Sequence, residues 1–394
     1  MADKRRFDLF ADLLEEVTQL ILGHPALCDL ATEWGKGLIT SWNGADWMAL
    51  PQRVGDKIGR LLGAAPGQVV AADSTTVNLY KVLCVALRAK PSRRVIVSEK
   101  GNFPTDLYVI EGVIEQLGGQ HELLLVDGTE EAIEAVLAQR AGQIAAVVLT
   151  HVHYTTSRIY EMRRLTRAAQ AAGAAMIWDL SHSAGVVPVE LDACSVDFAV
   201  GCGYKHLNGG PGAPAFLYAA RRWQGQAGQP IAGWMGDARP FDFHVGYEAA
   251  AGIACYLSGT PPVIALSALE ASVDLILEAP MDEIRRKSVA LGNLFVDLVE
   301  RQCAGLGLEL ASPGDGSLRG SHVSYRHPAS YPLMQALIAA DVIGDCRPPD
   351  LVRFGFAPLY ISYADIWRAV EALAAILRTR SWDKPEHRAR KLVT

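Results

Sequence analysis

The hydrophobic and polar positions of the chain follow two alternating patterns from about residue 68 onward. Residues 144–150 (IAAVVLT) form a continuous apolar run, as strands buried on both faces do, whereas residues 161–172 repeat their apolar positions at helical spacing. Further strands are expected at 94–98, 122–126, 175–179, 196–200 and 215–218, and further helices at 76–89 and 129–140. Apolar strands separated by helices predict an α/β fold with a mostly parallel sheet covered by helices.

The last third of the chain has a different pattern. A long helical pattern covers residues 262–301, and it is followed by expected strands at 308–310, 321–325 and 351–356 and expected helices at 332–340 and 364–378. We therefore expect a large α/β domain over residues 33–262 and a smaller α+β domain over 263–394, which starts with a long bridging helix. Residues 1–32 predict a divergent N-terminal helix, amphipathic between positions 7 and 21.

Composition narrows the class of protein. The chain has 394 residues, 50% of them hydrophobic, and a formal net charge of −6, which argues against a disordered chain and against a dominant basic surface for nucleic acid. No run reaches the roughly 18 apolar residues of a membrane helix, and no signal-peptide pattern follows the basic N-terminus. Seven cysteines without a CxxC pair are typical of free thiols in a reducing compartment, so we expect a cytoplasmic protein.

Candidate chemistry lies where the strands end, because open α/β sheets bind ligands beyond the carboxyl ends of their strands. Asp179 ends the expected strand 175–179, inside the segment WDLSHSAG, and His182 follows three residues later. A carboxylate buried at this position needs a partner. Asp179 therefore either caps the next element of structure or meets a bound group.

Lys205 is the second candidate, in the glycine-rich turn GCGYKHLNGG that follows the expected strand 196–200. Glycines let the backbone approach a flat group closely. A lysine amine whose pKa is lowered by desolvation suits imine formation with a carbonyl.

A third segment, DSTTVN at residues 73–78, leads into a helix. Hydroxyl groups and backbone N–H groups at a helix N-terminus form a phosphate site, unless they serve only as an ordinary N-cap. A phosphate site, a strand-end Asp179 and a glycine-flanked Lys205 together match the requirements of pyridoxal 5'-phosphate: a lysine for the Schiff base and a carboxylate for the pyridine nitrogen. Phe103 is the candidate to stack on the cofactor ring.

The sequence as a whole resembles the kynureninases, fold-type I pyridoxal-phosphate enzymes of the class V aminotransferase group, over residues 33–377. The matching segments are ADSTTVNLYK (72–81), GNFPTD (101–106), LTHVHYTTSRIYEM (149–162), WDLSHSAG (178–185), VDFAVGCGYKHLNGGPGAPAF (196–216), GWMGDARPFDF (233–243), YLSGTPPVIALSALEAS (256–272), RGSHVSYRHP (319–328) and RFGFAPLY (353–360). The resemblance implies a seven-stranded type of sheet, sandwiched by helices, in the large cofactor-binding domain.

The resemblance also implies roles for the matching residues. Lys205 would bond to the cofactor and move protons at the substrate Cα, Asp179 would pair with the pyridine nitrogen, and Tyr204 would contact the phosphate and act as an acid or base near the ketone. Arg353 would hold the substrate α-carboxylate. The further cofactor contacts implied are Thr75, Thr76, Phe103, Asp106, Thr150, His182, Trp234 and Thr260, the last two contributed by the neighbouring subunit of a homodimer.

The reaction that the resemblance implies is hydrolysis of the Cβ–Cγ bond of L-kynurenine or 3-hydroxykynurenine to anthranilate or 3-hydroxyanthranilate and L-alanine, in tryptophan catabolism. Family members begin with a segment resembling YLDGNSLG, which residues 1–32 do not contain. A relative with weakened activity is therefore one alternative.

The sequence argues against a metal site and against a dinucleotide-binding site. His151 and His153 point to opposite faces of an extended chain and match no metal-ligand spacing, so no metal is expected. Residues 209–212 (GGPG) do not form a dinucleotide fingerprint, because they follow no strand directly and contain a proline. A cysteine desulfurase would need a mobile catalytic cysteine, for which Cys346 is the loop-like candidate. A non-catalytic protein that retained the fold is the other alternative.

Overall fold

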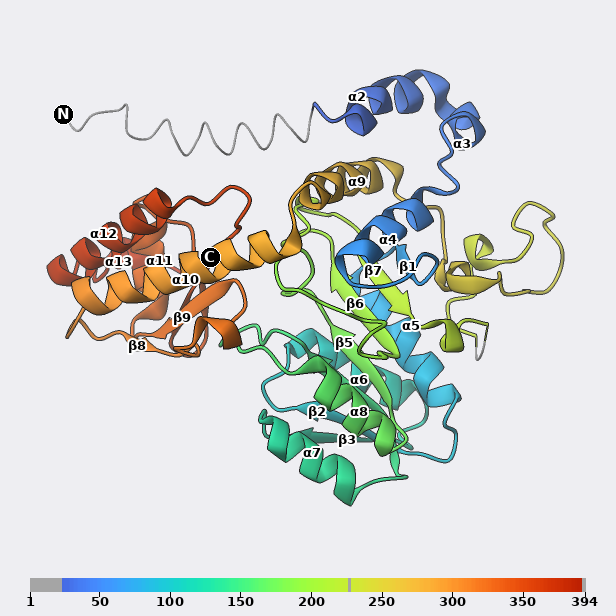
Figure 1. Cartoon of the computed structure of the whole chain (residues 1–394), viewed down its shortest axis with the longest axis horizontal. Coiled ribbons are helices and arrows are strands. Elements are labelled where there is room, and N and C mark those ends of the chain that lie inside the picture. The colour runs from blue at the N-terminus through green and yellow to red at the C-terminus, as the bar shows by residue number, and fades with distance from the viewer. Residues whose placement is uncertain (1–22, 226–227, 392–394) are drawn as a thin grey trace. The chain divides into compact units, whose positions relative to one another are not determined.

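The structure is a computed structural model that describes residues 23–225 and 228–391 (Figure 1). The amphipathic pattern expected at residues 7–21 lies outside the described residues, and the described N-terminal helix is α2 (Pro25–Thr32). By their internal contacts the described residues divide into two compact units: a larger one of residues 23–151 and 160–279, and a smaller one of residues 152–159 and 280–391.

The larger unit contains a seven-stranded sheet with the strand order β1-β7-β6-β5-β4-β2-β3. Its strands are β1 (Val69–Ala71), β2 (Val95–Glu99), β3 (Glu122–Val126), β4 (Ile144–Thr150), β5 (Ala175–Asp179), β6 (Phe198–Cys202) and β7 (Ala215–Ala219). The five strands from β2 to β6 pair in parallel, whereas β7 pairs antiparallel with both β6 and β1. The mostly parallel sheet predicted from the apolar runs is thereby confirmed.

Helices of the larger unit are α4 (Leu50–Leu61), α5 (Thr75–Arg88), α6 (Pro104–Gln116), α7 (Glu130–Gln139), α8 (Met162–Ala171) and α9 (Val263–Leu277), with short helices at Glu33–Gly37, Leu38–Thr40, α3 (Ser41–Gly44), Arg221–Trp223, Trp234–Gly236 and Gly252–Tyr256. Three helices begin at side-chain caps, in which Ser74, Thr129 and Glu161 accept backbone N–H groups. Helix α5 buries Val82 and Val85 against strand residues such as Ile96 and Phe198. The sheet and its helices share this core, which makes the ends of the strands rigid supports.

The smaller unit contains a four-stranded antiparallel sheet, in the order β10-β11-β9-β8, with helices packed on it. Its elements are α10 (Met281–Gln302), β8 (Glu309–Leu310), a short helix at Gly316–Leu318, β9 (His322–Arg326), α11 (Ser330–Ile338), β10 (Asp345–Arg347), β11 (Leu351–Gly355), α12 (Tyr363–Thr379) and α13 (Pro385–Arg388). Phe295, Val323, Val352 and Leu373 are all buried in its core. The α+β class expected for this part of the chain is therefore correct.

The single long helix expected over residues 262–301 is wrong. The structure has two helices there, because α9 ends at Leu277 and α10 begins after Pro280. A proline lacks the N–H that a continuous helix needs, and it disfavours helical conformation in the residue before it. By its contacts α9 belongs to the larger unit, so the units divide at Pro280, whereas the sequence placed the start of the second domain at residue 263.

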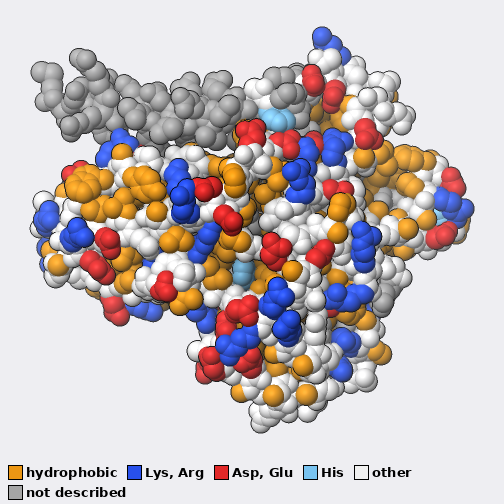
Figure 2. All heavy atoms as spheres, in the orientation of Figure 1, with side chains coloured by type: hydrophobic (Ala, Val, Ile, Leu, Met, Phe, Trp, Pro, Cys, Tyr) orange, Lys and Arg blue, Asp and Glu red, His pale blue; other side chains and the backbone are white. Residues whose placement is uncertain are grey.

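None of the described helices combines the length and the apolar character needed to cross a bilayer. Charged side chains are distributed over the face shown in Figure 2, and hydrophobic side chains gather on the side where the segment between β7 and α9 lies. The most exposed hydrophobic residues of that segment are Phe241, Phe243 and Val245.

Candidate active site

The carboxyl ends of β4, β5 and β6 bring three candidate residues to one edge of the sheet. Thr150 and Asp179 are register partners at the ends of β4 and β5. Asp179 is paired in turn with Val200 of β6, and Lys205 follows the end of β6 by three residues. This is the edge at which parallel α/β sheets bind ligands.

The amine of Lys205 lies close to two other predicted residues. Its Nζ is 3.1 Å from Nε2 of His182 and 5.9 Å from the centre of the Phe103 ring. Gly203 is required in the turn before this lysine, because a Cβ atom at that position would lie 2.3 Å from the carbonyl oxygen of Pro214. The glycines recognised in the sequence thus hold the lysine turn tightly against the next segment of chain.

Two buried carboxyl groups, Asp179 and Asp106, lie near Lys205. Burial raises the pKa of Asp179, and the charge of Lys205 and hydrogen bonds from Ser181 oppose that rise. Burial raises the pKa of Asp106 well above its usual value, and the neighbouring Asp179 raises it further. Each carboxylate is therefore costly to ionise without a nearby cation, and Lys205 lowers the pKa of both.

Thr150 is held by a group that the sequence analysis did not single out. Its Oγ1 donates to Oδ1 of Asn102 and lies 3.5 Å from Oδ2 of Asp106. Asn102 also accepts the N–H of Phe103 at 2.8 Å and donates to Oγ of Ser98 at 3.0 Å. Asn102 therefore fixes Phe103 and Thr150 together, and its place in the GNFPTD segment was the only signal for it.

The predicted phosphate contacts Thr75 and Thr76 lie in the first turn of α5. Ser74 caps this helix, and its Oγ accepts the N–H of Val77 at 3.3 Å. The remaining N–H groups of the first turn have no partner within the helix and are available to an anion. The N-cap is confirmed for Ser74, and the phosphate contacts of Thr75 and Thr76 stay a prediction.

Tyr204 is half exposed next to Lys205, whose Nζ lies 5.9 Å from the centre of its ring. Burial of the phenol, together with the neighbouring Cys202, raises the pKa of Tyr204 to about 12. At neutral pH the phenol therefore keeps its proton and acts as a hydrogen-bond donor.

Arg353 lies in the smaller unit, on β11. Its Nη1 donates to the carbonyl oxygen of Tyr154 at 2.5 Å, and its Nη2 donates to Oδ2 of Asp345. Burial lowers the pKa of Arg353 and Asp345 opposes that shift, but a guanidinium remains charged at physiological pH. The sequence predicted Arg353 and missed both of the groups that orient it.

Among the described residues, Trp234 and Thr260 make no hydrogen bond or ring contact with Lys205 or Asp179. Trp234 is 40% exposed and meets the ring of Phe241 at 5.6 Å between centroids. Thr260 lines an apolar groove of about 860 Å³ together with Trp34, Leu38, Ile39, Trp42 and Pro262.

Comparison with known proteins identifies the family. Two family models match the chain, one described as aminotransferase class-V over residues 43–302 and one as kynureninase C-terminal domain over residues 284–373. A kynureninase of Burkholderia pseudomallei (strain 1106a) is 47% identical over 369 residues, which cover 93% of this chain and 88% of that protein. The chain belongs to the kynureninase family. A kynureninase of Pseudomonas fluorescens is 45% identical with the same coverage.

Solved structures share the fold at lower identity. A cysteine desulfurase from Thermococcus onnurineus NA1 superimposes with a TM-score of 0.73 at 19% identity, over 85% of each chain. A variant of C-DES with glycine covalently linked to its pyridoxal-phosphate cofactor gives a TM-score of 0.76 at 14% identity, over 90% of this chain and 92% of that one. The fold of this kynureninase-family chain is therefore that of the fold-type I enzymes.

Kynureninases depend on pyridoxal 5'-phosphate, and the residues at the sheet edge fit this cofactor. The Asp179 carboxyl group is buried, its Oδ1 accepts the N–H of Ser181 at 2.7 Å, and burial raises its pKa. A protonated pyridine nitrogen beside it would supply a donor and a positive charge that favour the ionised carboxylate. Lys205 would provide the amine for the cofactor aldehyde, Phe103 would provide a ring to stack on, and α5 would provide N–H groups for the phosphate.

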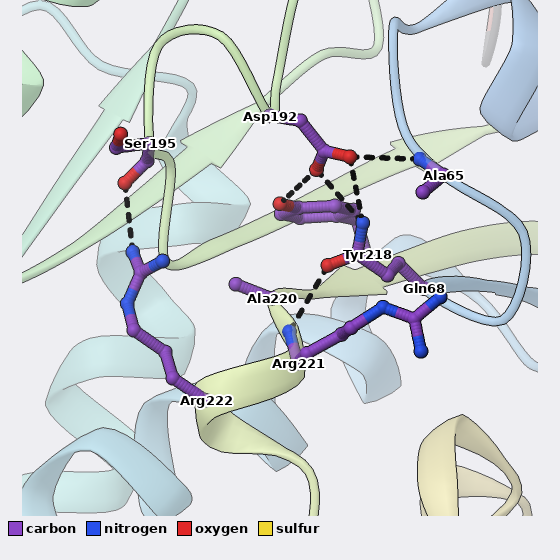
Figure 3. Close-up of a pocket in the computed structure, with 8 residues that line it drawn as sticks. All are labelled: Ala65, Gln68, Asp192, Ser195, Tyr218, Ala220, Arg221 and Arg222. Carbon is purple, nitrogen blue, oxygen red and sulfur yellow. Dashed lines mark hydrogen bonds between the residues drawn. The ribbon is translucent and has the colours of Figure 1, made fainter.

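A smaller pocket of about 270 Å³ lies away from these residues, beside β1 and β7 (Figure 3). Asp192 accepts hydrogen bonds there from the backbone N–H of Ala65, the amide of Gln68 and the hydroxyl of Tyr218. Arg222 donates to the carbonyl oxygen of Ser195. Because the polar groups of this pocket are used to join loops to strands, we assign it a structural role.

Proposed function

We propose that this chain hydrolyses the Cβ–Cγ bond of L-kynurenine or 3-hydroxykynurenine, giving anthranilate or 3-hydroxyanthranilate and L-alanine. The observation that carries the proposal is Lys205, held at the carboxyl edge of the sheet by His182 and flanked by Phe103 and Asp179, in a chain that is 47% identical to a kynureninase. Water is the second reactant, and it supplies the hydroxyl group of the aromatic product's carboxyl group.

When bound, pyridoxal phosphate withdraws electrons from the substrate and makes its Cα proton removable. The Nζ of Lys205 takes that proton and returns it, and His182 at 3.1 Å keeps the amine in place between these transfers. Arg353 binds the substrate α-carboxylate through its guanidinium. The negative charge of the Asp179 carboxylate stabilises the positive charge on the protonated pyridine nitrogen.

Tyr204 supports the steps at the ketone. With a pKa raised to about 12, its phenol is a donor at neutral pH, so it can donate a hydrogen bond to a phosphate oxygen or to the ketone oxygen of the substrate. A donor at the ketone stabilises the negative charge that develops when water adds to that carbon.

We further propose a homodimer in which Trp234 and Thr260 enter the site of the neighbouring copy. Both residues are exposed, and Thr260 lies in the apolar groove with Trp34, which is 54% exposed, and Ile39, which is 77% exposed. In the proposed homodimer, the second copy covers these exposed apolar side chains. A cytoplasmic location agrees with the cysteines Cys84, Cys194, Cys202, Cys255, Cys303 and Cys346, which are all free thiols.

The desulfurase alternative is disfavoured by the position of its candidate nucleophile. Cys346 lies buried in β10, in contrast to the mobile loop that this chemistry requires, and burial raises the pKa of its thiol. Cys303 is also buried at the end of α10, and burial raises its thiol pKa as well. A buried thiol with a raised pKa is a poor nucleophile.

The test is a fluorescence assay for anthranilate with purified protein, pyridoxal phosphate and either kynurenine or 3-hydroxykynurenine. We expect turnover of at least one substrate, and loss of that turnover in Lys205→Ala. The proposal is wrong if neither substrate is cleaved by cofactor-loaded protein, or if Lys205→Ala releases anthranilate at the unaltered rate. Persulfide formation from cysteine would support the alternative instead.

A further inference from the structure

A fully buried lysine, Lys81, lies in α5 behind the proposed phosphate site. Its ammonium group is 2.6 Å from Oδ2 of Asp73, donates to the carbonyl oxygen of Tyr256 at 2.7 Å and lies 3.4 Å from Oγ of Ser258. An ammonium has three donors, and each of these oxygens accounts for one. Burying such a charge is unfavourable unless its partners are held in place, so the three oxygens and the lysine fix one another.

The first partner, Asp73, controls the start of α5. Its backbone has a φ of 50°, in the left-handed region that a non-glycine residue adopts only when its surroundings hold it there. The carboxylate accepts from Lys81 and, at 3.2 Å, from Oγ of Ser258. The next residues are the cap Ser74 and then Thr75, so the ion pair with Lys81 sets the direction in which the first N–H groups of α5 point.

The second partner, Ser258, belongs to the segment that contains Thr260, and it also contacts the segment that contains Trp234. The N–H of Met235 donates to the carbonyl oxygen of Ser258 at 3.1 Å. Gly233 packs so closely that a Cβ atom there would lie 2.2 Å from the same oxygen. Ser258 thus positions both Trp234 and Thr260. The side chain of Ser258 is itself hydrogen-bonded to Asp73 and Lys81.

We propose that Lys81 is a positioning residue for cofactor binding in two sites at once. Through Asp73 it orients the phosphate-binding turn of its own chain, and through Ser258 it orients Trp234 and Thr260 for the site of a second copy. The second half of this inference rests on the proposed homodimer. It follows that a change at Lys81 in one chain should alter the pyridoxal phosphate affinity of both sites.

The first experiment measures cofactor affinity without using turnover. Apoprotein is titrated with pyridoxal phosphate and, separately, with pyridoxal, which lacks the phosphate, and binding is followed by absorbance. We expect Lys81→Met to weaken pyridoxal phosphate binding at least tenfold and pyridoxal binding less than threefold. The control is Lys90→Met, a lysine just beyond the other end of α5 that lies over the ring of Trp223 and that should leave both affinities unchanged.

A variant that keeps the buried ion pair covers the case in which Lys81→Met does not fold. Ser258→Ala removes only the hydroxyl that links Asp73 to the 256–260 segment. We expect a weaker but measurable loss of pyridoxal phosphate affinity, of about threefold or more. Unaltered affinity for pyridoxal phosphate in the folded Lys81→Met protein, or in Ser258→Ala if Lys81→Met is unfolded, overturns the proposal.

The second experiment tests the action on the neighbouring copy with hybrid dimers. One chain carries Lys205→Ala, so borohydride fixes the cofactor only on Lys205 of the other, unaltered chain. Adding Lys81→Met to the Lys205→Ala chain should raise the pyridoxal phosphate concentration needed for half-maximal fixation severalfold. Instability confined to the altered chain would not move the affinity of its neighbour's site.

The outcomes of the hybrid experiment separate this inference from the proposed function. Equal fixation with and without Lys81→Met overturns the action between copies, as does a protein that sediments as a monomer while binding the cofactor fully. Failure to cleave kynurenine, by contrast, contradicts the proposed reaction and leaves the cofactor affinities, and hence this inference, intact.

Discussion

Nζ of Lys205 lies 3.1 Å from Nε2 of His182, so the lysine proposed to bond to the cofactor has an imidazole as its hydrogen-bond partner. We expect His182→Ala to lower the turnover of kynurenine about tenfold, because one such hydrogen bond contributes about 1.4 kcal/mol to placing the amine. Steady-state kinetics of cofactor-saturated protein measures the effect. His121→Ala, at a partly buried histidine outside the site, is the control, and equal rates for His182→Ala and unaltered protein would contradict this role.

Asp345 is expected to orient Arg353, to which it is hydrogen-bonded in the smaller unit. Asp345→Asn removes the charge of this partner and should raise the KM for kynurenine about tenfold, because a hydrogen bond to a charged group is worth about 1.5–3 kcal/mol. The affinity for pyridoxal phosphate should not change. The control is Asp350→Asn, which removes the exposed pair with Arg326, and a KM that rises equally in both variants would refute the assignment.

Asp106 makes the apoprotein sensitive to pH. Burial and the neighbouring Asp179 raise the pKa of Asp106 well above the value of about 3.9 that it has in an unfolded chain. As the pH rises above about 4, the unfolded chain loses this proton first, so ionisation favours unfolding until the folded pKa is passed. Asp106→Asn cannot ionise, and its stability relative to the unaltered apoprotein should grow over this range by about 1.4 kcal/mol for each unit of the shift.

Urea unfolding of the two apoproteins between about pH 4 and pH 8 checks the prediction for Asp106. Asp127→Asn serves as the control, because Asp127 is an exposed residue paired with Lys100, and its contribution should stay within about 1 kcal/mol at every pH. A constant difference between Asp106→Asn and the unaltered protein across the range would show that Asp106 does not titrate as expected.

Gly203 should not tolerate a side chain. A Cβ atom there meets the backbone oxygen of Pro214 at 2.3 Å, and backbone cannot move aside cheaply, so Gly203→Ala is expected to destabilise the protein by about 1–3 kcal/mol and to weaken cofactor binding. Thermal unfolding and a cofactor titration measure the two effects. Gly112→Ala is the matched control, since nothing lies within 4 Å of its Cβ position in α6 and alanine should stabilise this helix by about 0.5–1 kcal/mol.

The sequence predicted those features that depend on local pattern. The strands at Glu122–Val126, Ile144–Thr150 and Ala175–Asp179 have the expected bounds. The last two are buried along their whole length, as their apolar runs predict, whereas Glu122–Val126 is an edge strand that buries only Val126. The break at Pro280 was missed because the helical spacing of apolar residues continues through α10. That spacing alone does not show that Pro280 lacks a backbone N–H. A single proline outweighed an otherwise regular pattern.

Site residues could be predicted where their local sequence context is unusual. Lys205 among glycines and Asp179 at a strand end have such a context, whereas Asn102, Asp345 and Tyr154 act through contacts between distant segments, and Tyr154 acts only through its backbone. Nothing in a local pattern reveals which carbonyl oxygen a distant arginine will reach.

Residues 152–159 are grouped by their contacts with the chain after Pro280, although their neighbours on both sides belong to the larger unit. Within the smaller unit this segment accepts hydrogen bonds from Ser324 at Thr155, from Gly320 at Ser157 and from Arg353 at Tyr154. A fragment beginning at Pro280 would therefore lack part of its own fold and leave these donors to water. The two units cannot be separated by a single cut, and a circular permutant or split protein must keep this segment with the C-terminal part.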